Sequence, residues 1–201
     1  MRYATNAPDG STWTKTPIDS ATAAGRYTSI AIDANSKAHI SYVDVTTYDL
    51  KYATNSSGSW ATFSLDSAGY INYHTSIVVD HADKIHISYY DSNVDDLKYI
   101  TNAPGYWSES VVVDSTVAGD NSSIAVDSSN KVFITYRDMT GGFNFLKLAT
   151  NKSGSWLSHR LNVVDAINYY TSLKIDTTDT LHLSCYLTAS GDLRYVRLKV
   201  E

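Results

Sequence analysis

Three histidines occupy the same position in a sequence segment that is repeated along the chain. His39, His86 and His182 each occupy the second place of the segments AHISYVD, IHISYYD and LHLSCYL. Three imidazoles are a ligand set that suits zinc. The fourth copy, VFITYRD, carries Phe133 at this place, and a position that accepts either His or Phe is typical of a half-buried aromatic slot. We therefore expect no metal ion and no other cofactor.

Four aspartates recur at the start of a turn in each copy, and they are Asp33, Asp80, Asp127 and Asp176. Asp33 with Asn35 has a spacing that could seat calcium, but a calcium site needs six or more oxygen ligands. Aspartate also accepts hydrogen bonds from the backbone of its own turn. We expect these residues to cap hairpin turns.

The sequence gives little support for a catalytic function. Asp91, Asp95 and Asp96 cluster in one segment, and glycosidases use two carboxylates about 5 to 9.5 Å apart in unlike environments. This segment has the composition of a solvated loop, which gives no reason for one carboxyl to stay protonated. Glutamate is nearly absent, with only Glu109 and Glu201, and the six arginines fall at unrelated repeat positions. We expect no catalytic residues.

The best candidates for binding lie where the first strand of each copy begins and the second ends. These positions stay polar or aromatic but differ from copy to copy, and they are Tyr27, His74, Asn121 and Tyr170 before the first strand, and Asp44, Asp91 and Asp138 at the end of the second. Tyr90, Arg137 and Tyr186 immediately precede the end of the second strand. A ring of aromatic and carboxylate side chains suits a carbohydrate or a peptide.

The elements that carry these residues are set by an internal repeat. Four copies begin near residues 28, 75, 122 and 171, and in each a tryptophan lies 15 residues earlier, at Trp13, Trp60, Trp107 and Trp156. Aromatic residues at one place in every repeat are typical of packing between repeats. Cys185, the single cysteine, replaces a repeated tyrosine, so we expect it to be buried in a strand.

Each copy contains four short segments of strand character and no amphipathic helix. In the second copy, TSIVVD is a short β-branched run, KIHISYYD alternates with period two, and DLKYITN and WSESVVVD follow after turn residues. Units of about 47 residues with four antiparallel strands are the signature of a β-propeller blade. The sequence predicts an all-β protein, a β-propeller with four four-stranded blades, and places the ring of candidate residues at one mouth of its channel.

The two ends of the chain predict how the ring closes. The last copy ends at Glu201, before the next tryptophan would fall, so it holds three strands. We expect residues 12–19, led by Trp13, to supply its missing outer strand, because closure removes an unpaired sheet edge. Residues 2–6 repeat a strand that the C-terminal copy already has. We assign residues 1–201 to one domain, with strands 2–6 and 12–19 belonging to the last blade.

The HISYYD and LKYATN cores resemble the tandem propeller repeats of large bacterial extracellular proteins, and they are distantly similar to sialidase-type and YVTN-type propellers. The resemblance covers nearly the whole chain. It implies a propeller fold and an extracellular or cell-surface location. It implies no particular function, because propellers host lectins, hydrolases, lyases and scaffolds.

The charge and hydropathy of the chain limit the classes of binding partner that we expect. Formal net charge is −5, from 16 basic and 21 acidic residues, with no basic cluster. This argues against nucleic acid or an anionic membrane as a partner. No apolar run approaches the roughly 20 residues that span a bilayer. The repeated sequence begins at Arg2, so we expect no signal peptide in this chain.

These observations favour a non-enzymatic binding module, lectin-like, with multivalent weak sites for a carbohydrate or a protein partner. Near-identical blades repeat a weak site easily but do not assemble an asymmetric catalytic centre. Two alternatives stay open: a polysaccharide hydrolase or lyase acting at the channel mouth, and a structural scaffold or repeat fragment without a ligand. The chain could form a four-blade monomer or, as a homodimer, a head-to-tail ring of eight blades.

Overall fold

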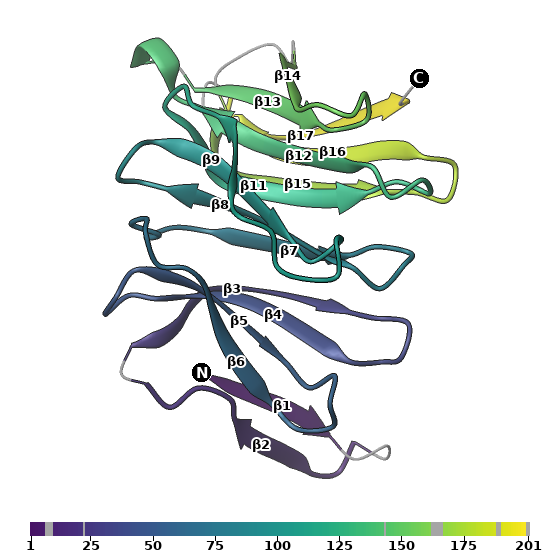
Figure 1. Ribbon diagram of the computed structural model, residues 1–201. Helices are drawn as coiled ribbons and strands as arrows, with labels where there is room; N and C mark the ends of the chain where they lie inside the picture. The colour runs from purple at the N-terminus through teal and green to yellow at the C-terminus, as the bar shows by residue number, and fades with distance from the viewer. Residues whose placement is uncertain (7–9, 22, 143, 162–166, 188–189, 200–201) are drawn as a thin grey trace.

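The protein is a stack of separate antiparallel sheets (Figure 1). The computed structural model describes all residues except 7–9, 22, 143, 162–166, 188–189 and 200–201, and it describes no side chains at 167–169. Sheet 1 contains β3 (Ala24–Ile32), β4 (Ala38–Asp44), β5 (Asp49–Thr54) and β6 (Ala61–Asp66). Sheet 2 contains β7 (Thr75–Val79), β8 (Ile85–Asp91), β9 (Asp96–Thr101) and β10 (Val111–Asp114).

Two further sheets continue the stack. Sheet 3 contains β11 (Ala118–Val126), β12 (Val132–Asp138), β13 (Phe145–Thr150) and β14 (Leu157–Arg160). Sheet 4 contains β15 (Ile167–Ile175), β16 (Thr180–Leu187) and β17 (Asp192–Lys199). In every sheet consecutive strands are neighbours. The described residues contain no α-helix, only the 3-10 turn η1 (Thr140–Gly142). The predicted all-β class is confirmed.

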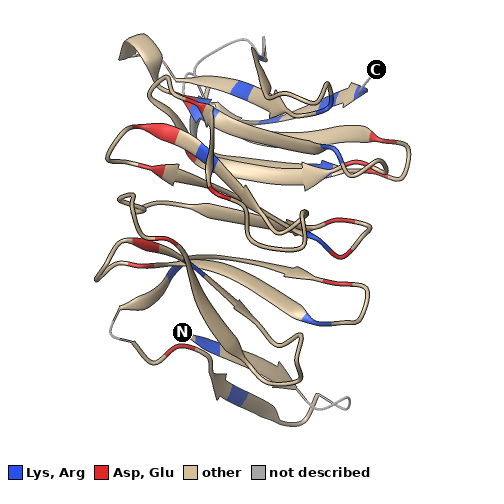
Figure 2. Cartoon of the chain, viewed as in Figure 1, with Lys and Arg blue, Asp and Glu red and all other residues tan. Residues whose placement is uncertain are grey.

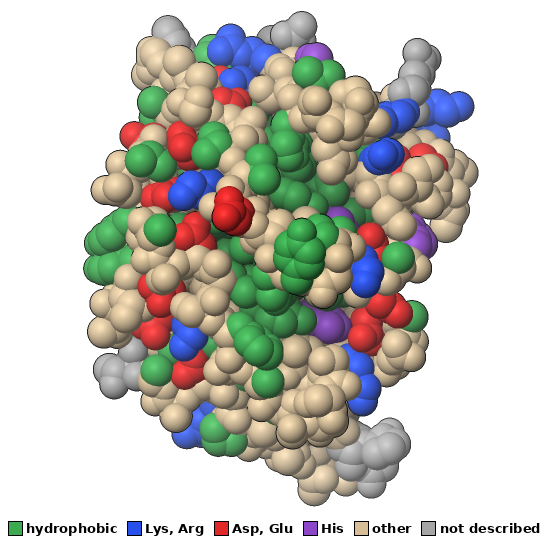
Figure 3. Space-filling model, in the orientation of Figure 1, with side chains coloured by type: hydrophobic (Ala, Val, Ile, Leu, Met, Phe, Trp, Pro, Cys, Tyr) green, Lys and Arg blue, Asp and Glu red, His purple; other side chains and the backbone are tan. Residues whose placement is uncertain are grey.

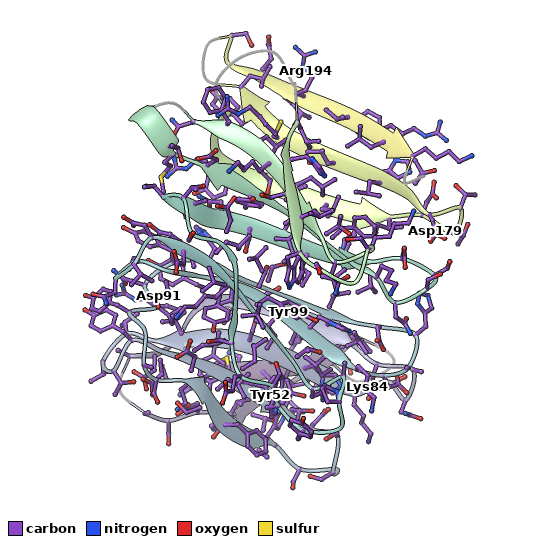
Figure 4. The ribbon with its side chains drawn as sticks, turned by 45° about the horizontal axis from the view of Figure 1, so that its top comes forward. Tyr52, Lys84, Asp91, Tyr99, Asp179 and Arg194 are labelled. Atoms are coloured by element: carbon purple, nitrogen blue, oxygen red, sulfur yellow. The ribbon has the colours of Figure 1, made fainter. Side chains whose placement is uncertain are left out.

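The second strand of each complete sheet is buried on both faces. In β8, Ile87 and Ser88 point to opposite faces, and both have 0% exposure. The repeated tryptophans pack between sheets on tyrosines of the third strands: Trp107 packs at an angle to Tyr52 of β5 with ring centroids 5.0 Å apart, and Trp156 packs in the same way on Tyr99 of β9 at 5.0 Å. Both tyrosines lie between sheets (Figure 4). The core is therefore a series of apolar layers between adjacent sheets.

A polar contact links sheet 2 to sheet 3 across one of these layers. Tyr136 on β12 donates its hydroxyl hydrogen to Asp114 Oδ2 on β10 at 2.6 Å, and Lys147 Nζ donates to the same oxygen at 2.9 Å. Burial is the main cause that raises the pKa of Tyr136, and its bond to Asp114 adds to it. Burial opposes ionisation of Asp114, but hydrogen bonds from Thr116, Tyr136 and Lys147 outweigh it and lower its pKa.

This contact of tyrosine, aspartate and lysine, which we call the triad, occurs at three junctions. Asp66 of sheet 1 accepts from Tyr89 of sheet 2 at 2.7 Å, and its Oδ2 lies 3.7 Å from Lys98 Nζ. Asp19, ahead of sheet 1, accepts from Tyr42 at 2.7 Å and from Lys51 at 2.8 Å. The segment before sheet 1 is therefore held as if it belonged to a preceding sheet.

The expected ring closure differs from the structure. β1 (Arg2–Asn6) and β2 (Trp13–Pro17) pair only with each other, and Tyr3 packs on Trp60 with centroids 5.1 Å apart. This N-terminal hairpin and sheet 4 lie at opposite ends of the stack (Figure 1). The sheets do not close into a ring, and three of them have four strands. The hairpin lies against sheet 1 because Asp19 completes a triad there.

Charge is distributed toward the turns. Acidic residues gather at the turns on both sides of the stack, and basic residues are prominent on β17 (Figure 2). The turn aspartates act as caps, as expected: Asp80 Oδ1 accepts from the backbone of Ala82 and Lys84, each at 2.8 Å. Within the described part of the chain, no helix has the length and apolar character to cross a membrane.

The triad at the junction of sheets 2 and 3 gives a test of stability. Tyr136→Phe removes one hydrogen bond and should cost about 1 kcal/mol of unfolding free energy. Asp114→Asn removes the charge that faces Lys147 and should cost about 3 kcal/mol. Urea denaturation measures both. Tyr106→Phe, at a tyrosine that is 70% exposed, is the control, and equal losses in all three variants would contradict the role of the triad.

Asp19 should make stability depend on acid pH. Burial opposes its ionisation, but hydrogen bonds from Lys51 and Tyr42 outweigh it and lower its pKa to about 2. In unfolded chains the pKa of Asp is about 3.9. Its stabilising effect is thus fully present above pH ~4 and lost as the pH falls through its folded pKa. In urea titrations from pH 5 downward, Asp19→Asn should lose less unfolding free energy than the wild type, whereas parallel profiles would refute this.

Candidate functional site

A pocket of 300 Å³ lies where sheets 2 and 3 meet. Tyr73, Tyr90, Asp120, Arg137 and Met139 line it. Tyr73 precedes β7 and Tyr90 lies next to the end of β8, whereas Asp120 and Arg137 belong to β11 and β12 of the next sheet. This is the edge of the stack marked by Asp91, opposite the hairpin turns marked by Lys84 and Asp179 (Figure 4).

The start of β11 is irregular, and this irregularity aims its side chains. Its pairing with β12 shifts register on both sides of Asp120, which is typical of a β-bulge. Asn121 has a φ of 55°, a region that non-glycine residues seldom adopt. Gly119 has a φ of 117°, and a Cβ there would lie 2.7 Å from the Cα of Leu97. Only glycine lets sheet 3 approach sheet 2 this closely.

A buried ion pair forms the floor of the pocket. Arg137 Nη2 donates to Asp120 Oδ2 at 2.7 Å, and the two residues are 7% and 6% exposed. The same nitrogen lies 2.9 Å from the sulfur of Met139. Removing two charges from water is costly, so a buried ion pair contributes little net stability. The pair therefore provides a fixed donor and a fixed acceptor at the pocket floor.

Three buried polar atoms near this floor make no hydrogen bond within the part of the chain that the structure describes. They are His74 Nδ1, Asp120 Oδ1 and Asn121 Oδ1. His74 Nδ1 lies 3.9 Å from Asp120 Oδ1, too far for a hydrogen bond. Buried polar atoms nearly always have partners, so this cluster has hydrogen-bonding capacity that a bound molecule could use.

Aromatic side chains surround the floor. Ring centroids of Tyr73 and Tyr90 are 5.8 Å apart, and Tyr73 also lies 6.3 Å from Tyr27. Tyr27 and Tyr170 lie 5.3 Å and 5.9 Å from His74. Tyr73 is 41% exposed and Tyr170 is 67% exposed. Two backbone features place Tyr27: its φ of 53° and a register shift at the start of β3.

Tyr90 acts as a neutral hydroxyl group. Burial raises its pKa, and its hydrogen bond to Asp95 adds to the effect. The phenol stays protonated at neutral pH, with its hydrogen donated to the Asp95 carboxylate. Its oxygen still has the capacity to accept a hydrogen bond.

The structure divides the residues that the sequence singled out. Tyr27, His74 and Tyr170 form one aromatic cluster, and Asn121 is adjacent to Asp120 of the pocket. The carboxylates Asp44, Asp91 and Asp138 do not line this pocket and instead face lysines: Asp91 accepts from Lys98 at 2.6 Å and Asp138 lies 3.1 Å from Lys147. Burial opposes ionisation of Asp91, but Lys98 and two backbone amides outweigh it and keep its pKa low.

Sequence reasoning missed Tyr73 and Asp120. Each lies one residue before a predicted site residue, at a repeat position that reads Arg26, Tyr73 and Asp120 in the first three copies. The change of residue type at this position from copy to copy was a sequence signal that marked it as a candidate binding position. Arg137 and Tyr90 were noted next to Asp138 and Asp91, and both line the pocket.

The three repeated histidines lie in separate sheets, away from the pocket. His86 Nε2 lies 3.1 Å from Asp80 Oδ2 and its Nδ1 lies 2.6 Å from the hydroxyl of Tyr99. His39 and His182 have the equivalent aspartate and tyrosine partners. In the described ranges of the chain, no group of three or more His, Cys, Asp or Glu side chains has a metal-binding arrangement.

No protein-family model and no curated protein matches the chain. Solved structures do match. A protein of unknown function from Dyadobacter fermentans DSM 18053 aligns over 87% of this chain and 65% of its own, with 9% identity and a TM-score of 0.64. The lectin SapL1, in complex with alpha methyl fucoside, aligns over 88% of this chain and 63% of its own, with 11% identity and a TM-score of 0.54.

A polysaccharide lyase, an ulvan lyase, also matches, over 98% of this chain and 62% of its own, with 12% identity and a TM-score of 0.54. The chain thus spans less than two thirds of the length of each of these three neighbours. Identities this low show the fold alone. The chain has an all-β fold of antiparallel sheets whose structural neighbours are β-propeller-like proteins.

The close approach at Gly119 predicts the outcome of a matched pair of substitutions. Gly58 also has a positive φ, of 93°, but a Cβ there would meet nothing within 4 Å. Gly58→Ala should cost about 1 kcal/mol from backbone strain alone. Gly119→Ala should cost about 2 kcal/mol more, because its methyl group would clash with the Leu97 backbone. Thermal or urea denaturation checks this, and equal costs would argue against the close packing of the sheets at the pocket.

Proposed function

We propose that this protein is a carbohydrate-binding, lectin-like module whose site is the pocket between sheets 2 and 3. The observation that carries the proposal is the combination of a buried Arg137–Asp120 pair, 2.7 Å apart, with exposed tyrosines around it. Sugars present hydroxyl groups that both donate and accept hydrogen bonds, together with apolar ring faces. Concave sites with a few fixed polar groups and aromatic walls suit such molecules.

The polar floor is suited to an uncharged ligand. Arg137 and Asp120 offset each other's charge, so the floor offers hydrogen bonds without a net charge to attract an ion. Asp120 Oδ1 and Asn121 Oδ1 are acceptors without a partner in the described structure, and neighbouring hydroxyl groups of a pyranose ring could donate to them. Bonds between a hydroxyl group and a carboxylate are stronger than neutral ones.

The tyrosines supply the apolar half of the site. Tyr73 is 41% exposed and packs beside Tyr90, so it presents a ring face and a polar hydroxyl group at the entrance. Burial of a sugar ring against such a face gains the hydrophobic free energy of the covered area. The liganded neighbour SapL1 supports a sugar as ligand, since that lectin is solved with alpha methyl fucoside.

Finer features of the proposal follow from the sequence. Residues 1–201 form one repeat domain of an extracellular or surface protein, as the resemblance of the HISYYD-type repeats implies. The floor pair occurs at only one junction, because the position of Arg137 holds Val43 in sheet 1 and Tyr90 in sheet 2. Each chain therefore has one site of this kind, and the multivalent binding expected from the repeats would need further sites at other junctions. A bare scaffold would bind no sugar.

One observation favours an enzyme as second candidate. Burial raises the pKa of Asp96, and Asp91 and Asp114 add to the rise, whereas the pKa of Asp91 is lowered. Two carboxyl groups with pKa values pushed apart are the pattern of an acid and a base. The saturated hydrogen bonds of Asp91 weigh against it as a base. Cleavage of a polysaccharide by the wild type, lost in Asp96→Asn, would favour this candidate.

Titration calorimetry with methyl α-fucoside, and then with a glycan array, tests the binding proposal. Tyr73→Ala should weaken binding of a sugar that binds the wild type by roughly tenfold, because about 1.4 kcal/mol of contact is lost. Asp120→Asn should weaken it at least as much. Tyr106→Ala, at an exposed tyrosine in the turn before β10, should leave affinity unchanged. Silence across the array, or equal affinity in all variants, would refute the proposal.

A further inference from the structure

The outer face of sheet 4 exposes positions that are buried or partly buried in the other sheets. One leucine position of the third strand is 0% exposed at Leu50 and Leu97 and 1% exposed at Leu146, but Leu193 is 79% exposed. A tyrosine position behaves in the same way, with Tyr99 at 6% and Tyr195 at 57%. In sheets 1 to 3 the next sheet covers these side chains, as Gly119 of sheet 3 covers Leu97.

The opposite end of the stack exposes the matching surface. The inner-strand position held by Ile77, Ile124 and Leu173 is 6%, 4% and 1% exposed. Ile30, at the same position of sheet 1, is 54% exposed, and Ile32 is 55% exposed. A groove of 310 Å³ runs between β1 and β3 here. Figure 3 shows hydrophobic side chains along the middle of another face of the stack, between polar turns.

These two end faces are the two halves of a junction that the molecule forms three times. At each junction a serine of the inner strand accepts a hydrogen bond from the backbone of the next sheet, at Ser29 from Ile77, at Ser76 from Ile124 and at Ser123 from Leu173. Side-chain hydroxyl groups also meet across it, as Ser88 Oγ and Ser122 Oγ do at 2.9 Å. Ser172 on sheet 4 and the backbone of Ile30 hold the corresponding positions.

We propose that sheet 4 of one chain packs on sheet 1 of a second copy of this chain, with Leu193 and Ile30 at the new junction. Surfaces that already fit each other within one chain fit equally well between two chains. The occupant is therefore specified by the junctions already present. Such a head-to-tail contact joins two different faces, so repeated association gives a closed ring or an open filament.

The N-terminal hairpin shows how the second copy would be accommodated. Met1 contacts Gly25 of sheet 1, where a Cβ would lie 2.7 Å from Met1 Cβ, and this repeats the contact of Leu97 with Gly119. Met1 and β1 thus occupy the place of a third strand. Because β17 is also a third strand, β17 of the second copy replaces β1 beside β2, and Leu193 takes the place of Met1. The redundancy of residues 2–6 has its explanation in this exchange.

Multi-angle light scattering on the whole chain tests the proposal. The wild type should show a mass of at least twice 22.1 kDa at high micromolar concentration. Ile30→Lys and Leu193→Lys should each give a mass near that of one chain, because a charge would enter the apolar junction. Both residues are exposed in a single chain, so circular dichroism spectra should be unchanged. Val94→Lys, at a side chain that is 51% exposed in a turn, should assemble like the wild type.

A mixture of the two blocked variants distinguishes this contact from a symmetric one. Ile30→Lys keeps an intact Leu193 face, and Leu193→Lys keeps an intact Ile30 face. The mixture should contain a complex of two chains that neither variant forms alone. A wild type of one-chain mass, assembly that survives both substitutions, or a mixture that stays at one-chain mass would overturn the proposal. None of these outcomes depends on sugar binding, so the two proposals fail separately.

Discussion

The stack depends on carboxylates buried between sheets. Asp66 and Asp114 are each 8% exposed, and a carboxylate removed from water is tolerated only when it is hydrogen-bonded and paired. The tyrosine and the lysine that satisfy it belong to the next sheet, so neither sheet satisfies its polar groups alone. The apolar layers supply most of the free energy, but they are not directional. The triads fix the register in which the N-terminal hairpin, sheet 1, sheet 2 and sheet 3 lie on one another.

The repeat explains how much of the fold could be predicted. Strand positions, hairpin caps and the tryptophan contacts all follow from patterns that recur every 47 or so residues. The placement of the N-terminal hairpin did not follow, because a segment led by Trp13 fits the outer position of any blade. The hydrogen bonds of Asp19 to Tyr42 and Lys51 place the hairpin against sheet 1. All copies share nearly the same sequence, so the sequence does not show with which copy such a long-range contact forms.

The candidate site was predictable to the extent that variation marked it. Tyr27, His74 and Tyr170 were selected because they differ between copies, and they lie together. The carboxylates Asp91 and Asp138 were selected in the same set, but their position reads Asp in three of the four copies. This shared position reflects a shared structural role, because each carboxylate pairs with a lysine. Asp120 was not predicted as a site residue. A bulge in β11 directs its side chain into the pocket, and the sequence alone does not indicate this bulge.

The one-sided burial of the end sheets has a consequence for cooperativity. In a linear array, stability is a sum of the intrinsic terms of each unit and the coupling of nearest neighbours. Sheets 2 and 3 are coupled on both sides, whereas sheet 4 is coupled on one, with Leu193 at 79% exposure. Opening should therefore begin at the ends and travel inward as a fraying of whole sheets. The pocket between sheets 2 and 3, at the central junction, lies in the last part of the molecule to open.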